Sequence, residues 1–250
     1  MEKILFLAHT QNDGTLARQA FEALTAAKSV AQGLGGELIA GILGEDVTAA
    51  ADAIAGTGIG KVYAVSGPDF GPSRYSTDAA AIEALVKASG ATVVIAAVSS
   101  RFNRVMPGAA CRLNGRIDTR VTGLAAVAGK LEIQRWYYRQ RMVATLTRAQ
   151  RPWFLLVESG VFEPAAAGSA KASVEKIGVA AGESLKRTQV TGFVAPASDA
   201  QTIRPDAELL FVAGAGWTKK QSDGQVHIKD AEKLILDLLN KTQASLGSSK

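Results

Sequence analysis

Four short apolar runs, each separated from the next by a segment of helical spacing, constrain this fold most. They span residues 4–8, 38–43, 61–66 and 92–98. Continuous apolar runs of this length are typical of strands buried on both faces of a parallel sheet. Connections of this length suit right-handed βαβ crossovers. The sequence therefore predicts an α/β fold with a doubly wound, mostly parallel sheet and helices on both faces.

Strand-like segments then follow one another without intervening helices. They cover residues 123–127, 131–138, 142–147 and 154–157, and we interpret them together as an antiparallel extension of the sheet. Two more short strands are predicted at 173–179 and 188–194. Before the extension, Pro107 indicates the start of a helix that runs to about residue 113, because proline is tolerated in a first helical turn.

The last part of the chain predicts an incomplete second α/β unit. A strand at 208–212 and a helix at 229–244 are joined by a glycine turn. One strand and one helix cannot close a sheet or bury a core. We therefore expect either a unit that docks on another surface or the beginning of a longer domain. The predicted organisation is a domain at 1–195, a proline-containing linker at 196–205, and a partial unit at 206–250.

Composition excludes several functions. One cysteine, Cys111, rules out an internal disulfide, and two histidines make a histidine-rich metal centre improbable, so no metal site is predicted. No catalytic residue is predicted, because no nucleophile has a recognisable base. No apolar run approaches the roughly 18 residues of a membrane span. A strand begins near the first residue without a signal peptide, so we expect a cytoplasmic protein.

The net charge of +5 raises the question of nucleic acid. One cluster combines basic and aromatic residues: Arg135, Arg139, Arg141, Arg148 and Arg151 with Trp136, Tyr137 and Tyr138. Such interleaving can stack bases. No nucleic-acid motif accompanies it, however, so we expect no nucleic-acid partner. A solvated strand or a protein-docking surface explains the cluster equally well.

Two loops that follow strands are candidate ligand sites. Ligands of open α/β sheets bind beyond the carboxyl ends of the strands, where helix N-termini attract anions. The first candidate is an anion site formed by Ser99, Ser100, Arg101 and Asn103; the alternative is a capped helix with solvated arginines. The second is the turn containing Gly214 and Gly216, which is similar to the start of a dinucleotide-binding turn but lacks its full spacing. Its alternative is a simple turn.

Taken together, the segments resemble the α subunit of electron transfer flavoproteins. The resemblance runs in order along the whole chain. It includes the opening strand at 3–9, the helix at 107–113, Asp118 with the segment 121–124, the strand Arg135-Trp136-Tyr137-Tyr138, and the segment 157–164. Each motif has low specificity alone, and their order carries the resemblance. It implies an adenine nucleotide α-hydrolase-like domain followed by the start of an FAD domain.

The resemblance also implies a cofactor and partners. Gly214 and Gly216 fall in the family's first FAD motif, and Ser248, Ser249 and Lys250 fall in the second, which contacts the FAD phosphates. Gly216 and Lys250 stand where the family has arginines, and the family's isoalloxazine segments do not follow. We therefore expect this chain alone to bind FAD weakly or not at all. The implied partners are a β-type subunit, flavin dehydrogenases that supply electrons, and an electron acceptor.

One alternative comes from another functional class. The same doubly wound architecture serves stand-alone, universal-stress-like regulatory domains. A protein of that kind would bind an adenine nucleotide at the edge formed by residues 99–103. Binding of an adenine nucleotide by a colourless homodimer would favour this alternative, whereas a tight complex with a β-type chain would favour the first hypothesis.

Overall fold

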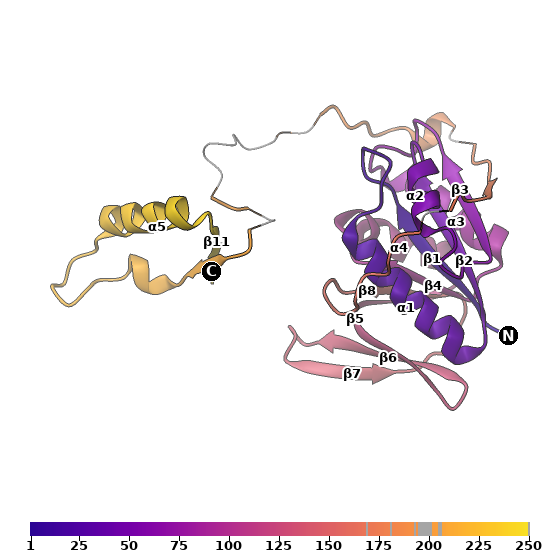
Figure 1. Cartoon of the computed structure of the whole chain (residues 1–250), viewed down its shortest axis with the longest axis horizontal. Coiled ribbons are helices and arrows are strands. Elements are labelled where there is room, and N and C mark those ends of the chain that lie inside the picture. The colour runs from indigo at the N-terminus through magenta and orange to yellow at the C-terminus, as the bar shows by residue number, and fades with distance from the viewer. Residues whose placement is uncertain (169, 181, 193, 195–201, 205–206, 250) are drawn as a thin grey trace. The chain divides into compact units, whose positions relative to one another are not determined.

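The computed structural model of the chain describes residues 1–168, 170–180, 182–192, 194, 202–204 and 207–249 (Figure 1). It separates into two compact units, Met1–Val190 and Thr191–Lys250. Each unit has its own sheet. The two are therefore described separately below.

The first unit is built on a nine-stranded sheet with the order β7-β6-β5-β8-β4-β1-β2-β3-β9. The predicted parallel strands are present as β1 (Lys3–His9), β2 (Glu37–Gly44), β3 (Lys61–Ser66) and β4 (Val93–Ala97). β1 lies between β2 and β4, and Ile4 pairs with both Leu38 and Val93. The prediction of a doubly wound, mostly parallel α/β fold is confirmed.

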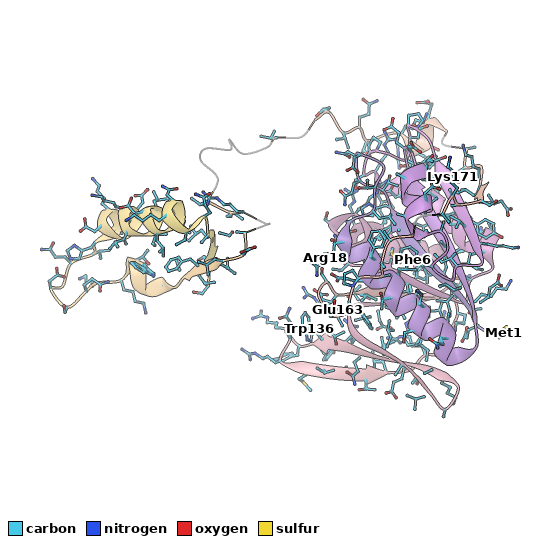
Figure 2. All side chains as sticks on the ribbon, in the orientation of Figure 1. Met1, Phe6, Arg18, Trp136, Glu163 and Lys171 are labelled. Carbon is cyan, nitrogen blue, oxygen red and sulfur yellow. The ribbon has the colours of Figure 1, made fainter. Side chains whose placement is uncertain are left out.

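Helices cover both faces of this sheet (Figure 1). On one face, α1 (Arg18–Leu34) and α2 (Thr48–Ile54) pack against one apolar cluster. On the other, α3 (Tyr75–Ser89) and α4 (Ser100–Arg112) pack against a second cluster. Phe6, labelled in Figure 2, belongs to the first cluster and is fully buried. Both faces are covered, which explains why the middle positions of the central strands are apolar without alternation.

The prediction that residues 154–157 belong to the antiparallel extension is wrong. They form β8 (Trp153–Val157), which lies parallel to β4 on one side and to β5 (Arg116–Val127) on the other. All of β8 is buried, as expected for a central strand covered on both faces. The antiparallel part consists of β5, β6 (Lys130–Tyr137) and β7 (Met142–Leu146).

The predicted position of Pro107 near a helix start is also wrong. The helix α4 begins at Ser100, and Pro107 lies inside it. The side chain of Ser99 caps this helix by accepting a hydrogen bond from the backbone N–H of Phe102 at 3.1 Å. Serine satisfies an orphan donor of the first turn in this way, so the helix starts at the cap and not at the proline.

The two further strands predicted after the extension have different outcomes. The first exists as β9 (Val174–Lys176), which pairs with β3 at the sheet edge. The second does not, since the described residues of 188–194 contain no strand. There the carbonyl oxygen of Thr188 accepts a hydrogen bond from Arg74 Nε at 2.8 Å. A short 3-10 helix, η1 (Glu183–Leu185), precedes this segment.

The second unit is a βαβ arrangement. β10 (Leu210–Ala213) leads into the 3-10 helix η3 (Ala215–Thr218), which is followed by α5 (Ile228–Thr242) and β11 (Ser245–Ser248). The second strand was not predicted, and it pairs parallel to β10. Apart from Thr202, Ile203 and Arg204, the predicted linker at 196–205 lies outside the described residues.

Candidate functional site

The two segments predicted to contact FAD meet at one edge of the second unit. β10 and β11 pair in parallel, with Ala213 opposite Ser248, so their carboxyl ends lie together. Beyond these ends the backbone N–H of Ser249 donates to the carbonyl oxygen of Ala213 at 3.3 Å. A Cβ placed on Gly214 would lie 3.9 Å from Ser249 Oγ. Segments more than thirty residues apart thus share the edge where α/β sheets bind ligands.

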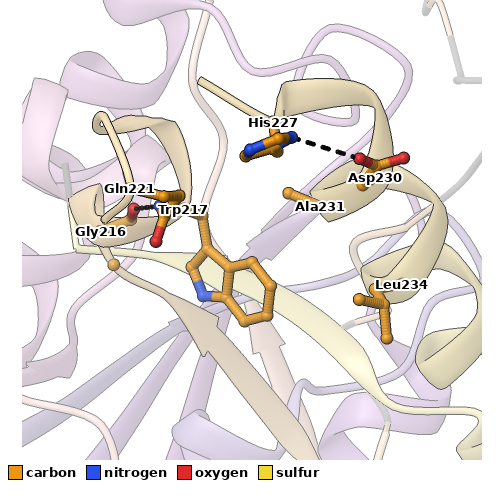
Figure 3. A pocket seen from close by; sticks show the side chains of 8 residues that line it. Gly216, Trp217, Gln221, His227, Asp230, Ala231 and Leu234 are labelled. Atoms are coloured by element: carbon orange, nitrogen blue, oxygen red, sulfur yellow. Dashed lines mark hydrogen bonds and ion pairs between the residues drawn. The ribbon is translucent and has the colours of Figure 1, made fainter. Parts of the chain in front are cut away.

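A pocket of about 530 Å³ opens beside this edge (Figure 3). Gly214 and Gly216 line it, as does the first half of α5. Its remaining lining residues were not foreseen from the sequence: Trp217, Gln221, His227, Asp230, Ala231 and Leu234. The volume lies within the range of small-molecule sites, about 300–1,000 Å³. Lys250, the last predicted FAD residue, lies outside the described residues.

Polar contacts hold the mouth of this pocket in shape. Gln221 Nε2 donates to the carbonyl oxygen of Gly216 at 3.3 Å. His227 Nε2 lies 2.6 Å from an oxygen of Asp223. Its Nδ1 lies 3.5 Å from an oxygen of Asp230 (Figure 3). The imidazole is therefore placed between two carboxylates. A lone histidine before a helix carries no motif, so the sequence offered no signal for this arrangement.

Carboxylate and aromatic groups complete the surroundings of this edge. Hydrogen bonds from the backbone N–H of Gln225 and from His227 lower the pKa of Asp223. The Trp217 ring meets the ring of Phe211 edge-on, with centroids 6.2 Å apart. Phe211 belongs to β10, so the strand itself positions the aromatic wall of the pocket. A glycine-lined turn beside an aromatic wall can admit an anionic group and a flat ring.

The predicted anion site lies in the first unit, at the end of β4, where Ser99 is already engaged. His9 Nδ1 lies 3.2 Å from the carbonyl oxygen of Thr10, so this nitrogen must carry the proton and donate. Nε2 is then free to accept from Ser99 Oγ, also 3.2 Å away, while that oxygen accepts from the N–H of Phe102. Burial lowers the pKa of His9, which favours this neutral form.

Arg101 of the same predicted site is buried in a different network. Its guanidinium makes two hydrogen bonds to the carboxylate of Asp78, at 2.8 and 2.6 Å. It also donates to the carbonyl oxygens of Phe70 at 2.7 Å and Gly71 at 3.1 Å. Most of its donors are therefore used within the fold. Arg101 ties the loop after β3 to the start of α4.

The remaining two residues of that site, Ser100 and Asn103, are exposed on the first turn of α4. The anion site stays a prediction, carried by these two side chains. The cavity at this edge, lined by His9 and Ser99 among others, measures about 20 Å³. This is room for about one water molecule. The geometry therefore gives no support to an adenine nucleotide at this edge, the alternative raised from the sequence.

The basic and aromatic cluster is largely paired within the first unit. Asp118, 1 % exposed at its side chain, accepts hydrogen bonds from Arg135 at 3.1 Å and from Trp153 Nε1 at 2.8 Å. Arg148 also binds this carboxylate, with two of its nitrogens. Arg151 instead binds the carboxylate of Glu2. These contacts leave Arg139 and Arg141 as the exposed arginines of the cluster.

The pKa of Asp118 reflects this network. Burial alone would raise it, but hydrogen bonds from Arg148 and Trp153, together with the charges of Arg148 and Arg135, outweigh burial and lower it. The carboxylate is thus held ionised at the junction of β5, β6 and β8. Its role is to join the antiparallel extension to the parallel sheet.

The comparisons with known proteins agree with this architecture. Its sheet and covering helices place the chain among the doubly wound α/β proteins. The family model described as "Electron transfer flavoprotein domain" matches residues 4–182. Because this match covers well over half of the sequence, the chain belongs to the electron transfer flavoprotein family. No curated protein matches it significantly. The match lies within the first unit, so the second unit has to be interpreted from its own geometry.

Among the residues that the structure describes, every helix is too short or too polar to cross a bilayer. Likewise, the described residues hold no group of three or more potential ligands suited to a metal ion.

Proposed function

We propose that this chain is an α-subunit-type electron transfer flavoprotein chain. It pairs with a β-type subunit, and the heterodimer, with FAD bound, carries electrons from flavin dehydrogenases to an acceptor. The family match supports the electron-transfer class. The α-type assignment rests on the second unit, whose order of strand, glycine turn, helix and Gly-Ser-Ser segment resembles the start of the α subunit's FAD domain.

One observation carries this proposal. The two segments assigned to FAD come together at the carboxyl edge of β10 and β11, although α5 separates them in sequence. A glycine at this position leaves the backbone accessible, so that a phosphate can approach the N–H groups closely. The second segment adds the hydroxyl of Ser249 on the same edge. The parallel pairing of the two strands thus places both motifs at the edge where a ligand of such a sheet binds.

The residues at this edge fit the phosphate part of FAD. Gly214 leaves room for an oxyanion, and Ser249 offers a side-chain hydroxyl and a nearby backbone. When bound, FAD supplies the redox chemistry, and the protein supplies orientation and electrostatics. Gly216 provides no positive charge where the family has an arginine. We therefore expect this chain alone to hold FAD weakly, and the partner subunit to complete the site.

The exposed apolar surface of the second unit supports a partner. Leu210 of β10 is 60 % exposed and Leu234 of α5 is 63 % exposed, and Leu209, Val212 and Leu238 are exposed as well. Clustered apolar side chains of this kind mark interaction surfaces. Covering these side chains stabilises a complex by about 25 cal/mol for each Å² of apolar surface removed from water. We assign this surface to the β-type subunit and to the completed FAD site.

The test is flavin retention by the full chain, purified alone and with a β-type subunit. We expect the complex to retain about one flavin per heterodimer and the isolated chain to retain far less. Gly214→Val places bulk at the shared edge, so the complex should lose most of its flavin. Gly192→Val is the matched control, because Gly192 has open space around it, and flavin should be kept.

Two results would overturn the proposal. A complex that forms but carries no flavin would reject the FAD assignment. A chain that ignores every β-type subunit offered, and stays a monodisperse monomer in sedimentation, would reject the α-type role. A stoichiometric flavin spectrum from the isolated chain would instead reject the expectation that the partner completes the site.

A further inference from the structure

A second pocket lies in the first unit, where the antiparallel extension ends. Its volume is about 470 Å³, and it is lined by Arg120 of β5, by the end of β6, and by the turn that joins β6 to β7. Trp136, labelled in Figure 2, is one of its lining residues. None of the residues proposed to contact FAD belongs to it, so it is a separate feature of the chain.

The backbone around this pocket is unusual. The described residues include seven non-glycine positions with positive φ, and four of them line this pocket. They are Arg120, Tyr138, Arg139 and Gln140, with φ values of 56°, 46°, 55° and 63°. Left-handed backbone is costly for residues with a side chain, about 1 kcal/mol or more each, and it concentrates at functional sites. Three of the four are consecutive and lie in the turn that joins β6 to β7.

The pocket also carries positive charge that is only partly neutralised. Arg135 is ion-paired with Asp118 through Nη1 at 3.1 Å, and its Nε is buried. Arg120 lies 4.0 Å from Glu158, at the limit of an ion pair. Arg139 forms no ion pair with any residue that the structure describes. Arg139 and the weakly paired Arg120 therefore line the hollow with donors that the fold has not fully used, which suits an oxyanion.

Aromatic rings line the same hollow. Tyr137 is 57 % exposed and Tyr138 is 67 % exposed, and Trp136 lies beside them. Exposed aromatic side chains next to arginines offer flat faces on which a planar ring can stack. The volume falls within the range of small-molecule sites, about 300–1,000 Å³. The chemistry thus calls for an anionic group and a planar ring in one ligand.

We propose that this pocket binds a small molecule that carries a phosphate or carboxylate group on a planar ring system. The oxyanion contacts the guanidinium groups of Arg120 and Arg139, and the ring lies against the tyrosines. Nucleotides and aromatic acids share this chemistry. The proposal concerns the first unit alone and does not depend on whether FAD binds at the second.

Calorimetric titration of the full chain tests it with four probes: AMP, benzoate, adenosine and inorganic phosphate. AMP binding would identify the anionic group of the ligand as a phosphate on a ring system. Benzoate binding would identify it as an aromatic carboxylate. At least one of the two should bind. Adenosine lacks the anionic group and inorganic phosphate lacks the ring, so each should bind about ten-fold more weakly or worse.

Two variants of the same turn provide the matched comparison. Arg139→Gln should weaken binding of the better probe about ten-fold, since it removes a lining guanidinium. Arg141→Gln removes an equally exposed arginine that does not line the pocket, and should change the affinity less than about two-fold. Arg139→Lys should restore part of the loss. Circular dichroism of each variant confirms that the sheet is intact.

Three outcomes would overturn the proposal. The first is that neither AMP nor benzoate binds at millimolar concentration. The second is that adenosine or inorganic phosphate binds as well as AMP or benzoate does. The third is that Arg141→Gln loses as much affinity as Arg139→Gln. The last result would mean that the turn attracts anions by general charge and that the pocket plays no part.

Discussion

The two units of this chain use the same βαβ pattern with opposite results. In the first, β4 and β8 are buried at every position, and the facing helices bury residues such as Leu24 completely. In the second, exposed and half-buried residues alternate along β10. Leu234 of α5, an apolar residue on an amphipathic helix, is 63 % exposed. Local sequence formed the elements in both units, but the sheet was buried only in the first.

The difference lies in the number of layers. The first sheet has helices on both faces, so each strand finds apolar neighbours above and below. The second sheet has two strands and a single α-helix among the described residues, and Leu239 and Ala244 are its fully buried apolar side chains there. A two-stranded sheet with one helix is too small to close a hydrophobic core of its own. The second unit therefore depends on further surface for burial, which is why we assign it a partner.

The largest effect should come from the junction within the first unit. Asp118→Ala removes the carboxylate that pairs with Arg135, Arg148 and Trp153 Nε1. The remaining buried donors would be left without their acceptor, and such losses cost about 3–5 kcal/mol. We expect the free energy of unfolding, measured with urea on the full chain, to fall by this amount.

Asp69→Ala is the control for that measurement. Asp69 also pairs with two basic residues, Arg74 and Lys186, but its side chain is 33 % exposed. Surface ion pairs of this kind contribute about 0–1 kcal/mol. Equal losses from the two variants would contradict the distinction between a buried junction and a surface pair.

A leucine pair compares the two units directly. Leu24→Ala in α1 deletes a fully buried side chain and should lower the free energy of unfolding by about 2–5 kcal/mol. Leu234→Ala in α5 deletes an exposed one and should change it by about 0.5 kcal/mol or less. If Leu234→Ala proves as costly in the isolated chain, the second unit is already packed, and the case for a partner surface there fails.

The parallel core of the fold could be predicted from sequence because its signal is local. The run at 4–8 is apolar throughout and the segment at 61–66 is apolar except at its two ends, and they became β1 and β3 with ends shifted by at most one residue. The position of β8 could not be predicted. Its apolar run shows that both faces are buried, but only its pairing with β4 and β5 shows where it inserts. Such pairing depends on contacts far apart in the chain.

The candidate sites show the same limit. The glycine turn at Gly214 and the segment at Ser249 were each weak signals, and it is the parallel pairing of β10 with β11 that brings them together. Conversely, Arg101 looked available for an anion, but its partner Asp78 lies 23 residues away on another helix. His227 lines the pocket without any motif. Spacing alone does not reveal which polar groups the fold has already used.

The smallest expected effect is a pH dependence that arises in the first unit. Burial lowers the pKa of His9 below its ordinary value of 6.5. The folded chain therefore binds this proton less tightly than the unfolded chain. Stability from His9 is complete above pH 6.5 and is lost as the pH falls from 6.5 through the lowered value. His9→Asn should flatten the dependence of the unfolding free energy on pH in that window. An unchanged slope would show that His9 is not the group responsible.

Hydrogen exchange of the full chain, alone and with a β-type subunit and FAD, tests the central claim most directly. In the isolated chain we expect slow exchange in β1, β4 and β8 and fast exchange in β10 and α5, because few apolar contacts protect the second unit. On addition of the partner and FAD, amides of β10, the turn at Gly214 and α5 should gain protection, while the first sheet changes little. Exchange in the second unit that is already slow alone, or is unchanged by the partner, would contradict the account.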